Sequence, residues 1–218
     1  YFSVILVVLG AVSYFFLEQD GTLKGMSTWG QITTSVFQSA TRTSGFNTVD
    51  IGSVGIPMLF MITILMFIGS SSSSTGGGIK TSTLAIVLAD VWRTIRGIEY
   101  VQLFQRTIPE LLRSRAYSVL LFFLMGNLLC IFVLSITEAE ILAQNGRNLL
   151  DLTFEQVSAM GTVGLSTGIT ADLSTAGKFI ISASMFVGRV GTLTVAFAIG
   201  GRLVTNHFKY PEGHTMVG

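Results

Sequence analysis

The chain has 218 residues, of which 50% are hydrophobic and 11% charged, and its formal net charge is +1. Soluble domains carry about 25% charged residues, so this composition, with a mean hydropathy of +0.66, predicts an integral membrane protein. The small net charge argues against a nucleic-acid partner, because no basic face is large enough to release many counterions. The single cysteine, Cys130, excludes an internal disulfide, and the two histidines lie in no acidic or cysteine cluster that favours a metal site.

The first predicted elements are a spanning helix and a much shorter one. Tyr1 to Leu17 is apolar and about long enough to cross a membrane if a few residues precede it. Because the sequence begins inside this segment, we expect further residues of the same subunit before it. A capping box at Thr28 and Gln31 then opens a short helix that reaches about Ala40. This helix is too short and too polar to span, so it is expected to be re-entrant.

A Gly/Ser/Thr stretch then separates two apolar segments, Val54–Ile68 and Ile79–Trp92. Glycine entropy and the competing hydrogen bonds of serine make a continuous helix through it unfavourable. A flexible linker is one interpretation. Broken backbone at membrane depth, however, is tolerated only where it is buried in protein or lines a watery cavity. The setting therefore favours a pore-lining break, formed by Gly69, Ser70, Ser71, Ser72, Ser73, Ser74, Thr75, Gly76, Gly77 and Gly78.

The same order of elements recurs in the second half. Ala116–Ile136 is a strong spanning helix, a short helix ends near Met160, and a last long helix runs from about Gly177 to Val204. Gly164 lies 119 sequence positions after Gly45, and this offset aligns the two halves without a gap. The same offset pairs Ser39 with Ser158, Thr43 with Thr162 and Gly69 with Gly188.

The predicted fold is an all-α polytopic membrane protein of repeated helix–pore helix–filter loop–helix units, as in potassium channels. The first membrane–pore–membrane repeat, with its broken second helix, covers residues 1–95. A cytoplasmic connection covers 96–115, the second repeat 116–205, and a cytoplasmic tail 206–218. Basic residues between and after the repeats set this orientation by the positive-inside rule, with both short helices and their loops facing outward. These residues are Arg93, Arg96, Arg106, Arg113, Arg115, Arg202 and Lys209.

The loops after the short helices are the predicted ion-binding sites. Thr162-Val163-Gly164 resembles the start of the potassium-channel filter, where backbone carbonyls replace the water shell of the ion. Glycine allows the backbone to turn its carbonyls toward one axis, and the negative end of the preceding helix dipole favours a cation. The predicted ligands are Thr43, Ser44, Gly45, Phe46, Thr162, Val163, Gly164 and Leu165, and K⁺ is the only metal expected.

Charges inside the predicted membrane segments are few. We find no Asp or Glu at mid-membrane depth, so a proton relay is unsupported. Arg189 lies in the middle of the last predicted helix, where a charge usually marks a functional pathway. A salt-bridged helix contact is the alternative, but the sequence offers no intramembrane acid for it. We therefore expect Arg189 to face the pore.

These motifs together resemble the Trk/Ktr/HKT superfamily of potassium transporters, and most closely the Ktr-type membrane subunit. The resemblance covers essentially the whole chain and rests on Thr43–Asn47, Ser74–Lys80, Gly161–Thr167 and Arg189. Members carry four repeats around one pore, and this chain is similar to the third and fourth. By this resemblance the Ser/Gly stretch, together with Lys80, forms an intramembrane gate below the filter, and Arg189 lies beside it.

The resemblance also implies function and partners. It implies potassium uptake across the plasma membrane, gated from inside, without an enzymatic activity or a covalent cofactor, and it leaves sodium open as a coupling or activating ion. The expected partners are the lipid bilayer, the missing N-terminal repeats, a second copy in a homodimer and a cytoplasmic nucleotide-binding (RCK-type) ring. Two repeats supply only half of a four-fold filter. The alternatives are a non-conducting membrane scaffold and a substrate-binding secondary transporter with broken helices.

Overall fold

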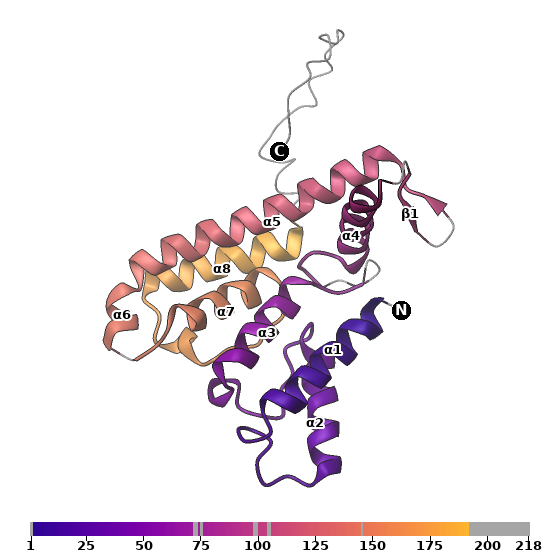
Figure 1. Cartoon of the computed structure of the whole chain (residues 1–218). Helices are drawn as coiled ribbons and strands as arrows, with labels where there is room; N and C mark the ends of the chain where they lie inside the picture. The colour runs from indigo at the N-terminus through magenta and orange to yellow at the C-terminus, as the bar shows by residue number, and fades with distance from the viewer. Residues whose placement is uncertain are drawn as a thin grey trace.

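A computed structural model describes residues 2–71, 74, 76–97, 100–103, 106–144 and 146–191. Within these residues the chain is almost entirely helical (Figure 1). The last predicted helix was expected to reach Val204, but it ends at Val190 with Gly191 as its C-cap. The basic residues Arg202 and Lys209 and the tail at 206–218 lie outside the described residues. The elements are α1 (Phe2–Leu17), α2 (Thr28–Thr41), η1 (Ile51–Ser53), α3 (Ile56–Phe67), α4 (Thr81–Arg96), β1 (Gln102–Leu103), β2 (Arg106–Thr107), α5 (Glu110–Thr137), α6 (Ala139–Gln144), α7 (Leu149–Met160), η2 (Ile169–Ala171) and α8 (Thr175–Val190).

α5 is the one helix in the described part of the chain that is both long and apolar enough to cross a membrane. Its 28 residues correspond to a length of about 42 Å. It begins six residues before the expected Ala116, because the polar turn after Pro109 already adopts helical geometry. Large apolar side chains such as Leu129 and Phe132 remain exposed along it. A helix at the core of a soluble protein would bury them, whereas a helix facing lipid would not.

The first short helix begins and ends close to its predicted bounds, but its cap was assigned to the wrong residue. Ser27, not Thr28, caps α2, because its Oγ accepts a hydrogen bond from the Gly30 amide at 3.2 Å. Gln31 does not complete a capping box; its side-chain amide donates to the Leu23 carbonyl at 3.3 Å. α7 ends at Met160 as predicted.

One apolar core joins the two halves of the chain. Tyr14 of α1, Met58 of α3 and Phe154 of α7 belong to it, and so does Val163 of the loop after α7. In Figure 1 the α1–α2 pair and the α5–α8 pair lie on opposite sides of α3 and α7. Because α3 packs against α7, the two predicted repeats form a single body rather than independent domains.

The expected break between the two apolar segments is present. α3 ends at Phe67 and α4 begins at Thr81. The chain on either side of the intervening residues is brought together by a parallel bridge between Ile68 and Ile79, in which the Gly69 amide donates to the Ile79 carbonyl at 2.9 Å. The break is therefore a closed loop with neighbouring ends rather than an extended linker.

Two buried glutamates connect helices at corresponding places in the two halves. Glu18 follows α1 and accepts a hydrogen bond from the amide of Gly55, the N-cap of α3, at 2.9 Å. Glu138 follows α5 and accepts from the amide of Ser174, the N-cap of α8, at 3.0 Å. Gly55 and Ser174 are related by the same offset of 119. The carboxylates satisfy amides at helix N-termini, where negative charge is also favoured.

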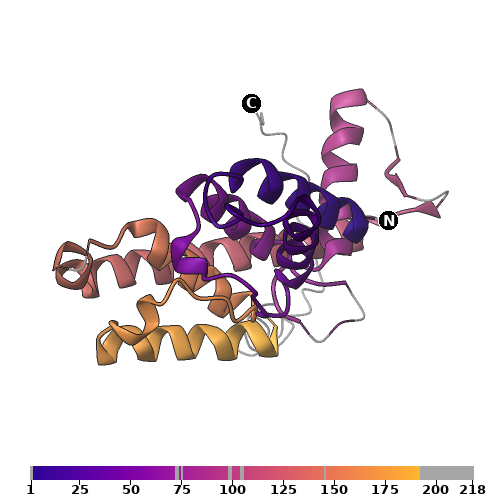
Figure 2. The same cartoon turned by 90° about the horizontal axis from the view of Figure 1, so that it is seen from below.

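The segment between the halves is ordered by a cluster around Asp90 of α4. The Asp90 carboxylate forms ion pairs with Arg113 of α5 at 3.0 Å and with Arg93 at 3.1 Å. It also accepts a hydrogen bond from the Tyr117 hydroxyl at 2.9 Å. Beyond this cluster the β1–β2 hairpin extends away from the helices in both views (Figures 1 and 2).

Candidate ion pathway

The two predicted ion-binding loops lie against each other. We call Thr43–Phe46 the first loop and Thr162–Leu165 the second loop. Gly45 and Gly164 both have positive φ, 73° and 94°, which is the region that side chains disfavour. A Cβ atom added to Gly45 would lie 2.4 Å from the Val163 carbonyl oxygen. Glycine is therefore required at Gly45 both by the backbone conformation and by the approach of the second loop.

The second loop is held from behind by the helix that precedes it. The Ser158 hydroxyl of α7 donates to the Leu165 carbonyl at 2.6 Å and accepts from the Gly164 amide at 3.2 Å. In the first half the corresponding Ser39 makes a different contact, donating to the Val7 carbonyl of α1 at 2.7 Å. The same residue type thus fixes the loop in one half and the helix packing in the other.

A cavity of about 490 Å³ opens beside the second loop. It is lined by residues of α7, of the second loop and its continuation, and of α8. Arg189, at the C-terminal end of α8, is one of the lining residues and is exposed. The structure therefore brings Arg189 and all four predicted ligands of the second loop to one cavity, whose other lining residues are Glu155, Ser158, Ala159, Ser166, Thr170 and Met185.

The loop between α3 and α4, which we call the Ser/Gly loop, contacts the second loop directly. The Gly77 amide donates to the Thr162 hydroxyl oxygen at 2.6 Å. The Lys80 ammonium donates to the carbonyls of Ser74 at 2.8 Å and Gly76 at 2.5 Å, so it fixes the shape of the loop from within. Gly69, Ser70, Ser71 and Gly78 are also described, whereas Ser72, Ser73 and Thr75 lie outside the described residues.

A buried arginine in front of the first loop was not predicted. Arg42 is only 4% exposed, and its Nη1 donates to the carbonyls of Leu65 at 2.6 Å and Ile68 at 2.7 Å. These carbonyls are left without helical partners because α3 breaks just beyond them. The signal that could have indicated Arg42 is its charge, two residues after the end of the predicted short helix.

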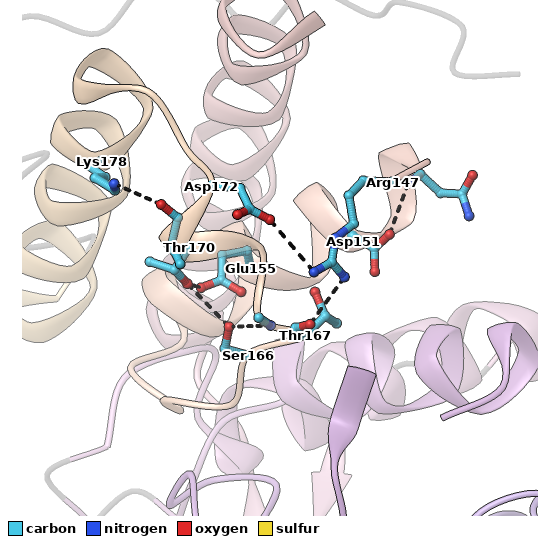
Figure 3. Close-up of polar contacts among 11 residues, drawn as sticks. Arg147, Asp151, Glu155, Ser166, Thr167, Thr170, Asp172 and Lys178 are labelled. Carbon is cyan, nitrogen blue, oxygen red and sulfur yellow. Dashed lines mark hydrogen bonds and ion pairs between the residues drawn. The ribbon is translucent and has the colours of Figure 1, made fainter. Parts of the chain in front are cut away.

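A buried carboxylate beside the second loop was also not predicted. Glu155 of α7 is 6% exposed and accepts a hydrogen bond from the Thr170 hydroxyl, which in turn lies 3.2 Å from the Ser166 hydroxyl. Figure 3 shows Glu155, Thr170 and Ser166 pointing toward one another. Asp90 of α4 is a second acid inside an apolar segment. Neither acid was predicted, because the mean hydropathy of an apolar segment changes little with a single charged residue.

The chain that continues the second loop is held by a further arginine. Arg147 donates from Nη1 to the Thr167 carbonyl at 3.3 Å, and its Nη2 lies 3.8 Å from Asp172 Oδ2 (Figure 3). These contacts join the segment before α7 to the residues on both sides of Gly168. The second loop is thus fixed by Ser158 behind it and by Arg147 beyond it.

Comparison with known proteins gives the family. A protein-family model described as TrkH, cation transport protein, matches residues 2–201. The chain is 39% identical to Ktr system potassium uptake protein D of Bacillus subtilis over 216 residues, which cover 98% of this chain and 46% of the relative. It is 37% identical to Ktr system potassium uptake protein B of Vibrio alginolyticus, covering 98% of this chain and 46% of that protein.

A third relative is named for two ions. The chain is 35% identical to the potassium/sodium uptake protein NtpJ of Enterococcus hirae, over 99% of this chain and 48% of that protein. The chain therefore spans about half the length of the curated relatives it matches.

A solved structure supports the fold. The crystal structure of the potassium transporter TrkH from Vibrio parahaemolyticus matches with a TM-score of 0.69 at 18% identity, over 88% of this chain and 42% of that one. The predicted all-α fold is thus confirmed. The chain belongs to the TrkH family of cation transport proteins, which are transporters and not enzymes.

Proposed function

We propose that this chain is the C-terminal half of a Ktr-type membrane subunit and forms half of a potassium uptake pathway. The relatives named as potassium uptake proteins are about twice its length. The chain corresponds on this account to the third and fourth of four repeats. The expected N-terminal repeats of the same subunit would supply the other two loops of the filter.

The observation that carries this proposal is the meeting of the two loops at Gly45 and Gly164. Both glycines have positive φ, and the Val163 carbonyl approaches Gly45 too closely for any side chain. Two loops of this kind present backbone carbonyls and a threonine hydroxyl in a confined space, which is what a dehydrated K⁺ takes in place of water. A non-conducting scaffold would have no need of either glycine.

The proposed gate is the Ser/Gly loop. It makes a hydrogen bond to Thr162 at the start of the second loop, and Lys80 holds its carbonyls. Arg189 lines the cavity beside the second loop, where its positive charge opposes the passage of a cation. The path would then be closed by two effects, the steric block of the Ser/Gly loop and the electrostatic repulsion between Arg189 and the cation.

The remaining parts of the proposal concern assembly and sidedness. The loops would face outward, with the α4–α5 segment and the C-terminus in the cytoplasm. The full subunit would form a homodimer in the plasma membrane on a cytoplasmic ring of nucleotide-binding (RCK-type) subunits. K⁺ is the transported ion, and Na⁺ is a candidate coupling or activating ion because one relative is named for both.

Rubidium uptake tests this proposal. Cells lacking their own potassium systems would express either this segment or a version extended by the N-terminal repeats of the same subunit. Uptake by the longer protein, with none by the segment alone at equal membrane expression, is the expected result. Uptake by neither would favour a scaffold, and uptake of an organic substrate instead of rubidium would favour a secondary transporter.

A further inference from the structure

One face of α4 exposes a row of large apolar side chains. Four of them are between 44% and 72% exposed, namely Leu88, Val91, Trp92 and Ile95. Their spacing of i, i+3, i+4 and i+7 places all four on one side of the helix. We call these four residues the α4 stripe. Another side of the helix contains the buried Asp90, which binds Arg113 and so holds α4 against α5.

The α4 stripe ends beside an exposed arginine. The guanidinium carbon Cζ of Arg96 lies 4.7 Å from the centre of the Trp92 ring. This cation–π contact restricts the guanidinium to one side of the indole. Among the described residues, no acid forms an ion pair with Arg96. Its charge can therefore bind an anion from outside the chain.

The negative charge of α4 itself does not offset this arginine. Asp90 is the one acid in the sequence of α4, and its carboxylate already pairs with Arg93 and Arg113. The C-terminal end of a helix carries about half a negative charge, which the two arginines of the last turn, Arg93 and Arg96, outweigh. The end of α4 is therefore a positive surface next to an apolar one.

The order of side chains along α4 matches the layers of one membrane leaflet. Leu88 and Val91 come first, Trp92 follows and Arg96 is last, over about 12 Å of helix. Aliphatic side chains suit the acyl chains, and tryptophan is enriched at the boundary between membrane and water. Arginine can bind a phosphate through two parallel hydrogen bonds. A surface for a protein partner would not require this order.

We propose that Trp92 and Arg96 form a binding site for the headgroup of an anionic phospholipid, whose acyl chains lie against the α4 stripe. Arg96 binds the headgroup phosphate, and the Trp92 ring holds the guanidinium in place. A zwitterionic lipid binds less well, because its positive headgroup is repelled by the arginines. The site is separate from the ion pathway and requires only that α4 lies in the membrane.

Quenching of Trp92 fluorescence tests the site. The full-length subunit, with every other tryptophan replaced by phenylalanine, is reconstituted into vesicles of phosphatidylcholine and phosphatidylglycerol in equal amounts. Bromine, which quenches tryptophan on contact, is placed on the acyl chains of one lipid or of the other, so the two samples differ in nothing else. We expect phosphatidylglycerol to be preferred at Trp92 about fivefold, the contribution of one arginine near an anionic lipid surface.

Three variants in the same background separate the site from a general effect of positive charge. Arg96→Gln should abolish the preference for phosphatidylglycerol. Arg96→Lys keeps the charge but cannot bind phosphate through two parallel hydrogen bonds, so it should keep part of the preference. Arg115 is also exposed but lies on α5, so Arg115→Gln is the matched control and should keep the full preference.

Three results would overturn the site. One is equal quenching by the two lipids in the protein with Arg96 intact. Another is a preference that survives in Arg96→Gln or that is lost equally in Arg115→Gln. The third is no quenching by either lipid, which would show that protein, such as the N-terminal repeats or a regulatory subunit, covers the α4 stripe. Rubidium uptake tests the proposed function separately, so failure of one leaves the other standing.

Discussion

At the scale of single residues, Arg42 is the side chain on which the helix break most depends. Breaking a helix leaves its last carbonyls unpaired, and in lipid no water replaces their partners. The Gly69 amide, which would normally bond to Leu65, donates to Ile79 instead. The guanidinium of Arg42 supplies the missing donors to Leu65 and Ile68. The unpaired carbonyls of the broken helix thus explain why a charged side chain is buried here.

Replacing Arg42 with Gln should destabilise the folded protein, because each buried carbonyl left unpaired costs about 1–3 kcal/mol. We expect the melting temperature of the detergent-solubilised full-length protein to fall by about 4 °C or more. Arg42→Lys retains a cationic donor, so its melting temperature should lie between those of the parent protein and of Arg42→Gln. Arg115 is exposed, so Arg115→Gln is the matched control. Equal melting temperatures for Arg42→Gln and Arg115→Gln would show that Arg42 has no role in holding the break.

At the scale of elements, the glutamates after α1 and α5 fix the starts of α3 and α8. Glu138 is fully buried and accepts from both the amide and the hydroxyl of Ser174, the N-cap of α8. The carboxylate can accept both bonds, whereas a glutamine would present its amide donors to one of these groups. These two hydrogen bonds thus fix the position of the start of α8 relative to the end of α5.

Glu138→Gln should therefore lower the stability of the folded protein by about 1–3 kcal/mol, the range for a buried hydrogen bond that loses its partner. Thermal unfolding followed by tryptophan fluorescence in detergent would measure this. Glu140, two residues further and exposed, gives the control variant Glu140→Gln. If Glu138→Gln and Glu140→Gln lowered the stability by the same small amount, the buried carboxylate of Glu138 would have no special role.

At the scale of the whole molecule, the two halves share one core while covering only about half the length of their relatives. Most core residues come from α1, α3 and α7, and Val163 and Leu165 of the second loop belong to the same core, so the second loop is positioned by packing that both halves share. Exposed apolar side chains along α1 and α5, such as Val8 and Leu129, remain for lipid or for neighbouring protein.

How far this arrangement could be read from the sequence depends on the kind of signal. The break at Gly69 and the end of α7 at Met160 were predictable because composition changes abruptly there. The contact between Gly77 and Thr162 was not, because it joins residues 85 positions apart. Arg42 and Glu155 were missed because a single charge changes the mean hydropathy of a segment little. In addition, the carbonyls that Arg42 binds and the hydroxyl that Glu155 binds are set by tertiary packing. The roles of the two loops as an ion filter and of the Ser/Gly loop as a gate stay predictions.

The central claim is that the first and second loops select potassium. The most direct test is the ratio of K⁺ to Na⁺ permeability of the full-length protein in vesicles, measured for Gly45→Ala and Gly164→Ala. Gly25→Ala is the control, since Gly25 also has positive φ (84°) but open space around it. We predict that the ratio falls toward one in both loop variants and is unchanged in Gly25→Ala. Unchanged ratios in both loop variants, at normal expression, would contradict the account.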